Sequence, residues 1–165
     1  AKKHRGNGAI VTRGMPGKVL DAGVNDAGNM GAAMAPSAYR TIRAHFDDLH
    51  CAPSDFDLIV TGDLGQTGKE LLMELARKDG ISLGGKLTDC GTLIFDNTTQ
   101  DVHAGGSGCG CSAITLCGYF LDKIRSKTIK TILFCGTGAL LSPTSTQQGL
   151  PIPGVCHAVS ITGGK

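Results

Sequence analysis

Short apolar runs of strand length alternate along the chain with longer stretches in which apolar residues recur at helical spacing. The runs that predict strands are 18–22, 57–61, 92–95, 131–135 and 155–161. The run at 57–61 is almost continuously apolar, which is typical of a strand covered on both faces. Strands that alternate with helices of about 10–15 residues favour βαβ units with right-handed crossovers. The pattern predicts an α/β fold with a mixed five-stranded sheet covered by helices, and neighbouring core strands at 57–61 and 131–135.

Three helices are expected between these runs. The first begins near Pro36, a residue suited to the first helical turn. The second begins at residues 67–70, which have the form of a capping box, and ends at Gly80. The third follows the glycine-rich turn at 105–110. Their apolar positions are, in order, Ala38, Ile42, Phe46 and Leu49, then Leu71, Leu72 and Leu75, then Ile114, Cys117, Leu121 and Ile124. Residues 142–153 are expected to form a long surface loop.

Composition narrows the class of protein. The 165 residues suffice for one domain with its own core, and the 25 Gly indicate many tight loops. Sixteen basic and fourteen acidic residues give a net charge of +2, which provides no broad field for nucleic acid. No apolar run approaches the roughly 20 residues of a transmembrane helix. We therefore expect no nucleic-acid partner and no transmembrane segment in this chain.

The first residues and the cysteines indicate what kind of protein the chain comes from and in which redox compartment it occurs. It begins Ala1-Lys2-Lys3-His4, without an initiator Met or an apolar signal core, so we expect a piece of a longer protein. The seven Cys are odd in number and lie mostly in apolar or glycine-rich segments. Reduced thiols in a reducing compartment are the better interpretation.

Two motifs suggest ligands but have the wrong spacing. Residues 62–69 follow a strand and open a helix, yet Asp63 and Glu70 stand where a phosphate loop requires Gly and Ser or Thr. Cys109-Gly110-Cys111 could hold a metal, but no second pair of ligands lies at a matching distance in the sequence. We therefore expect neither a metal nor a cofactor.

The turn Gly105-Gly106-Ser107-Gly108 is more informative. Small residues before a helix expose backbone N–H groups at the positive end of the helix dipole, which suits a carboxylate or a phosphate. The alternative is that these glycines only allow the helix to pack closely on the sheet. His103 precedes the turn and is either a base or donor for a ligand or a structural residue. Asp63 and Asp89, at the expected ends of elements, are weaker candidates for facing a cleft.

Several longer motifs carry a family resemblance. Residues 30–38 and 54–58 resemble runs in the carboxy-terminal half of the thiolase superfamily. Within that superfamily the chain resembles most closely the stage V sporulation protein AD family. The motifs that carry this resemblance are residues 26–36, 58–64, 89–91, 104–113 and 137–143. They extend along almost the whole chain but match only the second half of that family's proteins.

The resemblance implies a thiolase-like half with αβαβα layers, in which residues 1–165 form the carboxy-terminal domain of a longer protein whose amino-terminal half is absent. It also implies a role in the uptake of dipicolinic acid, pyridine-2,6-dicarboxylate, into the developing spore. The family acts peripherally at the inner membrane of the forespore or spore, and its implied partners are membrane proteins of the same sporulation operon. An assembly of identical chains is left open.

The chain departs from the thiolase pattern at three places. Gly62-Asp63 replaces an Asn-Glu pair whose Asn supports the oxyanion hole. His103 stands in place of the His of a Gly-His-Pro loop, but without the Pro. Cys135 corresponds to the acid/base Cys, yet the following glycines are spaced differently. The first hypothesis is therefore a dipicolinate-binding protein; the alternatives are a thiolase-like acyltransferase and a scaffold that docks on membrane partners.

The expected site follows from these comparisons. No residue is assigned as catalytic, and His103 and Cys135 are the nearest candidates. The expected ligand-binding residues are His103, Gly105, Gly106, Ser107, Gly108, Cys109 and Thr137.

Overall fold

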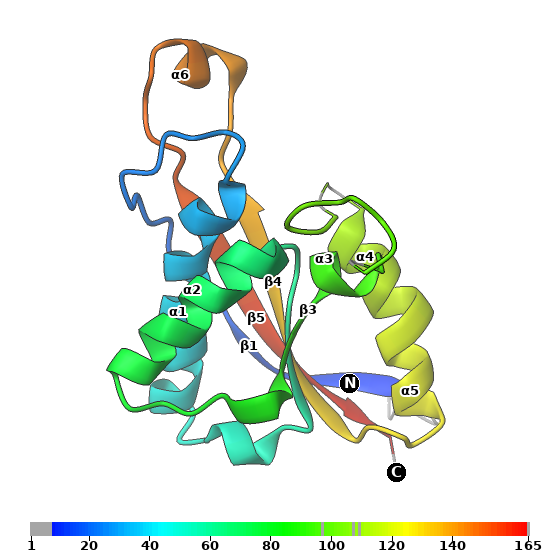
Figure 1. Ribbon diagram of the computed structural model, residues 1–165. Helices are drawn as coiled ribbons and strands as arrows, with labels where there is room; N and C mark the ends of the chain where they lie inside the picture. The colour runs from blue at the N-terminus through cyan, green and yellow to red at the C-terminus, as the bar shows by residue number, and fades with distance from the viewer. Residues whose placement is uncertain (1–7, 97, 107, 109, 165) are drawn as a thin grey trace.

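The strands of this protein form one mixed sheet in the order β1-β5-β4-β2-β3 (Figure 1). The computed structural model describes residues 8–96, 98–106, 108 and 110–164. The strands are β1 (Ala9–Met15), β2 (Leu58–Thr61), β3 (Leu87–Asp89), β4 (Thr131–Ala139) and β5 (Gly154–Gly163). β2 is parallel to β3 and β4, whereas β5 is antiparallel to β4 and β1. The predicted α/β fold with a mixed five-stranded sheet is confirmed.

Helices cover both faces of the sheet (Figure 1). On one face lie α1 (Met30–Asp48) and α2 (Gly65–Lys78). On the other face α4 (Cys111–Thr115), a π-helical turn η3 (Leu116–Phe120) and α5 (Leu121–Arg125) form one continuous helix. The short elements are η1 (Pro53–Asp55), η2 (Gly84–Lys86), α3 (Cys90–Leu93) and α6 (Pro143–Gln147). Of these, α3 directly follows β3, and α6 lies at the tip of an arm formed by β4 and β5. None of the helices that the structure describes has the length and apolar character needed to span a bilayer.

The central strands alternate their side chains between two apolar clusters. Ile59 and Leu133 pack toward α1 and α2, whereas Val60 and Ile132 pack in the cluster that contains α5. All four side chains are fully buried. The predicted neighbours β2 and β4 are confirmed, since Leu58 pairs with Ile132. Burial on both faces explains why the run at 57–61 is almost continuously apolar.

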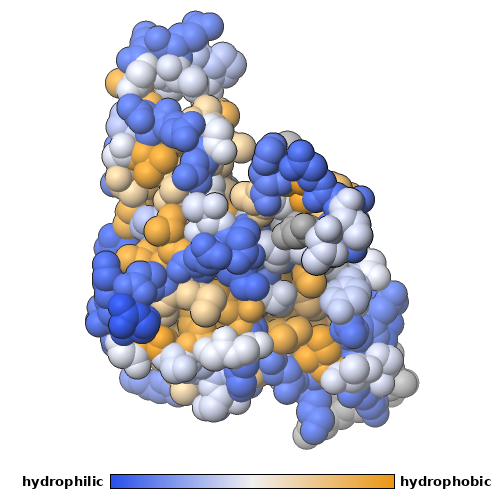
Figure 2. Space-filling model, viewed as in Figure 1, coloured by the Kyte–Doolittle hydropathy of each residue, from blue (hydrophilic) through white to orange (hydrophobic). Residues whose placement is uncertain are grey.

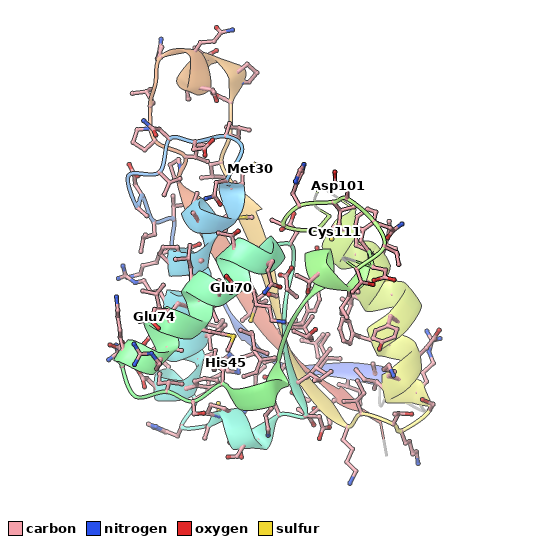
Figure 3. All side chains as sticks on the ribbon, viewed as in Figure 1. Met30, His45, Glu70, Glu74, Asp101 and Cys111 are labelled. Carbon is pink, nitrogen blue, oxygen red and sulfur yellow. The ribbon has the colours of Figure 1, made fainter. Side chains whose placement is uncertain are left out.

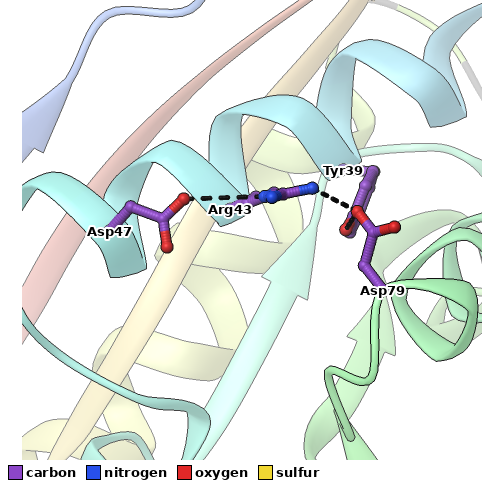
Figure 4. Close-up of polar contacts among 4 residues, drawn as sticks. All are labelled: Tyr39, Arg43, Asp47 and Asp79. Atoms are coloured by element: carbon purple, nitrogen blue, oxygen red, sulfur yellow. Dashed lines mark hydrogen bonds and ion pairs between the residues drawn. The ribbon is translucent and has the colours of Figure 1, made fainter.

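Two features bring α1 and α2 close together. A Cβ on Gly31 would lie 2.2 Å from the carbonyl oxygen of Leu64, so glycine is required at this crossing. Nearby, Tyr39 and Arg43 of α1 both donate hydrogen bonds to the carboxylate of Asp79, at the end of α2 (Figure 4). Because this polar cluster is exposed, it is expected to contribute little to stability. The close packing at Gly31 is therefore expected to contribute more to stability than the exposed polar cluster.

Two of the predicted strands are wrong, and two strands were not predicted. In the segment 18–22 only Leu20 forms a bridge, with Gly154. The segment 92–95 overlaps α3 instead of forming a strand, because the preceding residues of β3 already occupy the place beside β2. β3 and β1 were missed. β3 has only three residues, and β1 is largely exposed along its length, so neither leaves a strong apolar pattern.

The predicted helix starts are also corrected. α1 begins at Met30 and not near Pro36, which lies inside the helix; the Asn29 side chain accepts a hydrogen bond from the N–H of Ala32 and caps it. α2 begins at Gly65, before the expected capping box at 67–70. The predicted stop at Gly80 is confirmed, with φ of +73°. The segment 142–153 is not simply a loop, since it contains α6.

Three residues expected on buried helical stripes are exposed, namely Leu71, Ile114 and Cys117. In the continuous helix that starts with α4, Ile124 is buried as predicted, and the other buried positions are Cys111, Thr115 and Phe120. The step of five residues from Thr115 to Phe120 coincides with the π-helical turn, which rotates the buried face relative to a regular α-helix.

Candidate functional site

A cavity of about 400 Å³ lies beyond the carboxyl end of β2, beside the last residues of β4. In Figure 2 the surface is hollowed between the arm that carries α6 and the neighbouring lobe. Met30, at the start of α1, and Cys111, at the start of α4, lie on opposite sides of this hollow (Figure 3). We name it the carboxyl-edge pocket; it is lined by residues 28–31, 34, 63, 65, 104–106, 108, 112 and 137–139. Ligands of α/β proteins commonly bind at this edge of a sheet.

Asp63 and Thr137 form a reciprocal pair of hydrogen bonds in the wall of the pocket. The Thr137 hydroxyl donates to Asp63 Oδ1 at 2.9 Å and accepts from the Asp63 N–H at 3.1 Å. The other carboxylate oxygen of Asp63 accepts from the N–H of Gly108 at 3.4 Å, a weaker contact. Both carboxylate oxygens of Asp63 therefore have donors within the protein, and the pair ties the segment after β2 to β4.

Thr137 also fills the space beside Gly62. A Cβ built on Gly62 would lie 2.7 Å from the Thr137 hydroxyl oxygen and 3.1 Å from the Thr137 backbone nitrogen. This is the position where the thiolase resemblance would place an Asn. A side chain cannot enter here unless Thr137 moves.

The glycine turn uses part of its N–H groups internally. Gly105 donates to the carbonyl of Val102 and Gly106 to the carbonyl of Gly91, each at 2.9 Å. Of the described residues of the turn, only Gly108 directs its N–H toward a side chain in the pocket wall, that of Asp63. These two backbone bonds reduce the number of donors that the turn can offer to an anion.

Close packing accounts for one of the glycines. A Cβ on Gly106 would lie 2.3 Å from Cε2 of Phe95, so the absence of a side chain lets the turn pack on the residues after α3. Close packing therefore explains Gly106, and Gly105, Gly106 and Gly108 also line the pocket. Ser107 and Cys109 lie outside the described residues.

His103 is directed to solvent. Its side chain is 90% exposed, its Nδ1 lies 3.7 Å from Oδ1 of the equally exposed Asp101, and it is not among the lining residues of the pocket. Its backbone has φ of +50°, which belongs to the tight turn before Ala104. In this arrangement the imidazole does not face the pocket.

Cys135 is buried in β4. A hydrogen bond with Cys156 and burial raise the pKa of the Cys135 thiol well above its ordinary value. The thiol is therefore protonated at neutral pH, and it does not line the pocket. Of the two nearest catalytic candidates, the structure places one outside the pocket and one beneath its surface.

Two other described thiols near the pocket, those of Cys90 and Cys111, also have a raised pKa and are therefore unreactive at neutral pH. Burial raises the pKa of Cys90 to about 12 and also raises that of Cys111. The six described cysteines are free thiols. In the part of the chain that the structure describes, no group of three His, Cys, Asp or Glu side chains is arranged to hold a metal ion.

Several lining residues were not identified from the sequence. Asn29 and Met30 line the pocket because α1 begins earlier than expected, and Ser112 does so at the start of α4. A signal for Asn29 existed, since Asn is a preferred cap at the start of a helix. Ser112 and Gly138 lie in the motifs 104–113 and 137–143, but nothing in their local pattern distinguishes a lining residue from a packed one.

Comparison with known proteins shows the family. The model of the family described as stage V sporulation protein AD (SpoVAD) matches residues 2–162. The stage V sporulation protein AD of Bacillus subtilis (strain 168) is 42% identical over an alignment of 164 residues, and the match covers 93% of this chain. The chain belongs to the stage V sporulation protein AD family. It spans 48% of the length of that relative. The resemblance inferred from the motifs is confirmed.

Solved structures with a similar arrangement are more distant. The 3-oxoacyl-[acyl-carrier-protein] synthase III of Aquifex aeolicus VF5 is 14% identical, with a TM-score of 0.47 over 96% of this chain and 53% of that chain. The acetyl-CoA acetyltransferase of Bacillus anthracis is also 14% identical, with a TM-score of 0.47 over 94% of this chain and 30% of that chain.

Proposed function

We propose that this chain forms part of a dipicolinate-binding site in a protein that acts in dipicolinate uptake into the developing spore. Membership of the stage V sporulation protein AD family supports the sporulation role. The carboxyl-edge pocket, with a volume of about 400 Å³, has the size of a small-molecule site. Its partners would be membrane proteins of the same operon, and it would act peripherally at the spore inner membrane.

The packing of Thr137 against Gly62 is the observation that favours binding over catalysis. Acyl transfer requires a donor for the oxyanion together with a reactive base or nucleophile. In this structure the hydroxyl of Thr137 takes the space in which a side chain at position 62 would start. His103 is directed to solvent, and Cys135 is buried and protonated. The described residues thus supply a polar wall without a complete set of catalytic groups.

The pocket contains groups that suit a flat dicarboxylate. The side chains of Asn29 and Ser112 contribute an amide and a hydroxyl group to the lining, whereas the only proton of the Thr137 hydroxyl is donated to Asp63. Gly28 and Gly138 leave room for a ring to approach the backbone. Asp63 is an acid, but hydrogen bonds from Thr137 and Gly108 occupy its two oxygens. Carboxylates of the ligand would therefore bind to the amide and hydroxyl groups on the other side of the pocket.

The test is a calorimetric titration with dipicolinate and, separately, with acetyl-CoA. The full-length protein that contains this chain is expected to bind dipicolinate and not acetyl-CoA, whereas this chain alone is expected to bind dipicolinate weakly. Ser112→Leu places an apolar side chain in the pocket and is expected to weaken dipicolinate binding at least about tenfold, which corresponds to about 1.4 kcal/mol. Ala113→Leu is the matched control, because Ala113 is exposed on the same helix and does not line the pocket.

Two outcomes would contradict the proposal. Saturable acetyl-CoA binding with acyl transfer would favour the acyltransferase alternative. No binding of either compound would favour a scaffold that only docks on membrane partners.

A further inference from the structure

A buried carboxylate lies next to the carboxyl-edge pocket but does not line it. Asp89, the last residue of β3, has no exposed surface. Its Oδ1 accepts hydrogen bonds from the Thr61 hydroxyl at 2.7 Å and from the N–H of Leu64 at 2.9 Å, and its Oδ2 accepts from the N–H of Gly65 at 3.0 Å. Thr61 ends β2, Leu64 lies in the segment that joins β2 to α2, and Gly65 is the first residue of α2. The 62–65 segment carries Asp63 and Gly65 into the pocket wall.

The glycine turn is held close to the same carboxylate. A Cβ on Gly91 would lie 3.1 Å from Asp89 Oδ2 and 2.3 Å from the carbonyl oxygen of Gly106. Gly91 accepts a hydrogen bond from the N–H of Gly106, and Ala104 accepts one from the N–H of Gln66. Two walls of the pocket, the 62–65 segment and the 104–106 turn, therefore meet beside Asp89.

We propose that Asp89 is a positioning residue whose ionised carboxylate fixes the 62–65 segment and thereby the shape of the carboxyl-edge pocket. Its two backbone partners can only donate hydrogen bonds, and the Thr61 hydroxyl donates here as well, so this set of partners favours the ionised carboxylate. The expected effect of Asp89 on dipicolinate binding rests on the function proposed above, whereas its effect on the 62–65 segment does not.

The charge of Asp89 does not increase the stability of the folded protein. Burial raises the pKa of Asp89, and the ionisable groups close to it in the described chain, Asp63, Cys90 and Cys111, bring no positive charge. A carboxyl whose pKa is higher in the folded protein favours folding at low pH and loses that contribution as the pH rises through the raised pKa. Carrying the charge in the folded protein thus costs stability, and a local role explains the buried carboxylate better.

Asp57 offers a matched comparison. Its Oδ2 also accepts two backbone N–H groups, from Lys130 at 2.6 Å and Thr131 at 2.9 Å, at the other end of β4 and away from the pocket. These hydrogen bonds lower the pKa of Asp57, first through Thr131 and then through Lys130. The Asp57 charge therefore stabilises the fold at neutral pH, in contrast to that of Asp89.

The experiment compares Asp89→Asn with Asp57→Asn by amide hydrogen exchange, thermal unfolding and dipicolinate titration. In Asp89→Asn the amides of Leu64 and Gly65 are expected to exchange at least roughly tenfold faster than in the parent, with a melting temperature no lower than that of the parent. Dipicolinate binding should weaken to a similar extent. Asp57→Asn should lower the melting temperature and leave Leu64, Gly65 and the ligand affinity unchanged.

The inference is overturned if Asp89→Asn keeps the protection of Gly65, or if it loses stability throughout the molecule as Asp57→Asn does. Should Asp89→Asn fail to fold, Thr61→Val removes one donor without changing the size of the side chain. It must then raise the exchange rate of Leu64 for the inference to stand. If the parent itself does not bind dipicolinate, the proposed function fails, while the exchange rates still decide the role of Asp89.

Discussion

At the scale of single residues, the pocket is shaped by pairs of positions that are distant in the sequence. Gly62 and Thr137 are one such pair: the hydroxyl of Thr137 lies where a side chain at position 62 would begin, and it also bonds to Asp63. The sequence alone does not show that Gly62 and Thr137 are neighbours. The absence of a side chain at 62 and the presence of a hydroxyl at 137 are thus parts of one local arrangement.

This pairing predicts non-additive substitutions. Gly62→Asn should destabilise the protein by about 1–3 kcal/mol, because the new Cβ overpacks against Thr137. Thr137→Gly should lose the hydrogen bonds to Asp63. The double variant should be less destabilised than the sum of the single variants, since the second change makes room for the first. Urea unfolding of the four proteins measures this coupling, and strict additivity would show that Thr137 does not restrict position 62.

His45 predicts how stability depends on pH. It is fully buried in α1, its Nε2 lies 3.0 Å from the Ser160 hydroxyl, and its Nδ1 has no partner among the described residues. Burial and, to a lesser extent, the charge of Arg13 lower its pKa below 6.5. The unfolded chain therefore binds the proton more tightly, so the free energy of unfolding should fall as the pH decreases from about 6.5 through the lowered pKa.

The variant His45→Gln should show a weaker dependence of the free energy of unfolding on pH between 7 and 5, measured in urea at closely spaced pH values. His50→Gln is the control, because His50 is exposed. An unchanged pH dependence in His45→Gln would assign the acid sensitivity to other groups.

At the scale of elements, apolar pattern and helix geometry explain which predictions succeeded. The strands at 57–61, 131–135 and 155–161 are confirmed because they lie at the centre of the sheet and must be apolar. The run at 92–95 fits a helix or a strand equally well, and only the pairing of β3 with β2 decides between them. The π-helical turn shifts the buried face in a way that a regular spacing of 3.6 cannot predict.

The crossing of α1 and α2 predicts a further effect. Gly31→Ala should destabilise the protein by about 1–3 kcal/mol, since its Cβ would lie 2.2 Å from the backbone oxygen of Leu64, which cannot move without shifting the start of α2. Gly85→Ala is the control, because a Cβ there meets nothing within 4 Å. Thermal unfolding distinguishes the two, and equal melting temperatures would mean that α1 and α2 adjust without cost.

At the scale of the whole molecule, the fold brings together segments that are remote in the sequence. The start of α1, the segment after β2, the glycine turn before α4 and the end of β4 meet at one edge of the sheet. Four of the five motifs that carry the family resemblance contribute residues to the lining of this pocket. Side-chain orientations could not be predicted: His103 is directed to solvent although it corresponds to the His of the Gly-His-Pro loop, because the turn at 101–104 directs it away from the sheet.

The most direct measurement of the central claim is a titration of the isotopically labelled chain with dipicolinate, followed by nuclear magnetic resonance of the backbone amides. Such a titration detects even a weak complex. If the carboxyl-edge pocket binds dipicolinate, the amides of Gly28, Gly65, Ser112 and Gly138 shift and saturate together, while the remote Gly85 does not shift. The claim is contradicted if none of these amides shifts, or if the saturable shifts lie at another surface of the molecule.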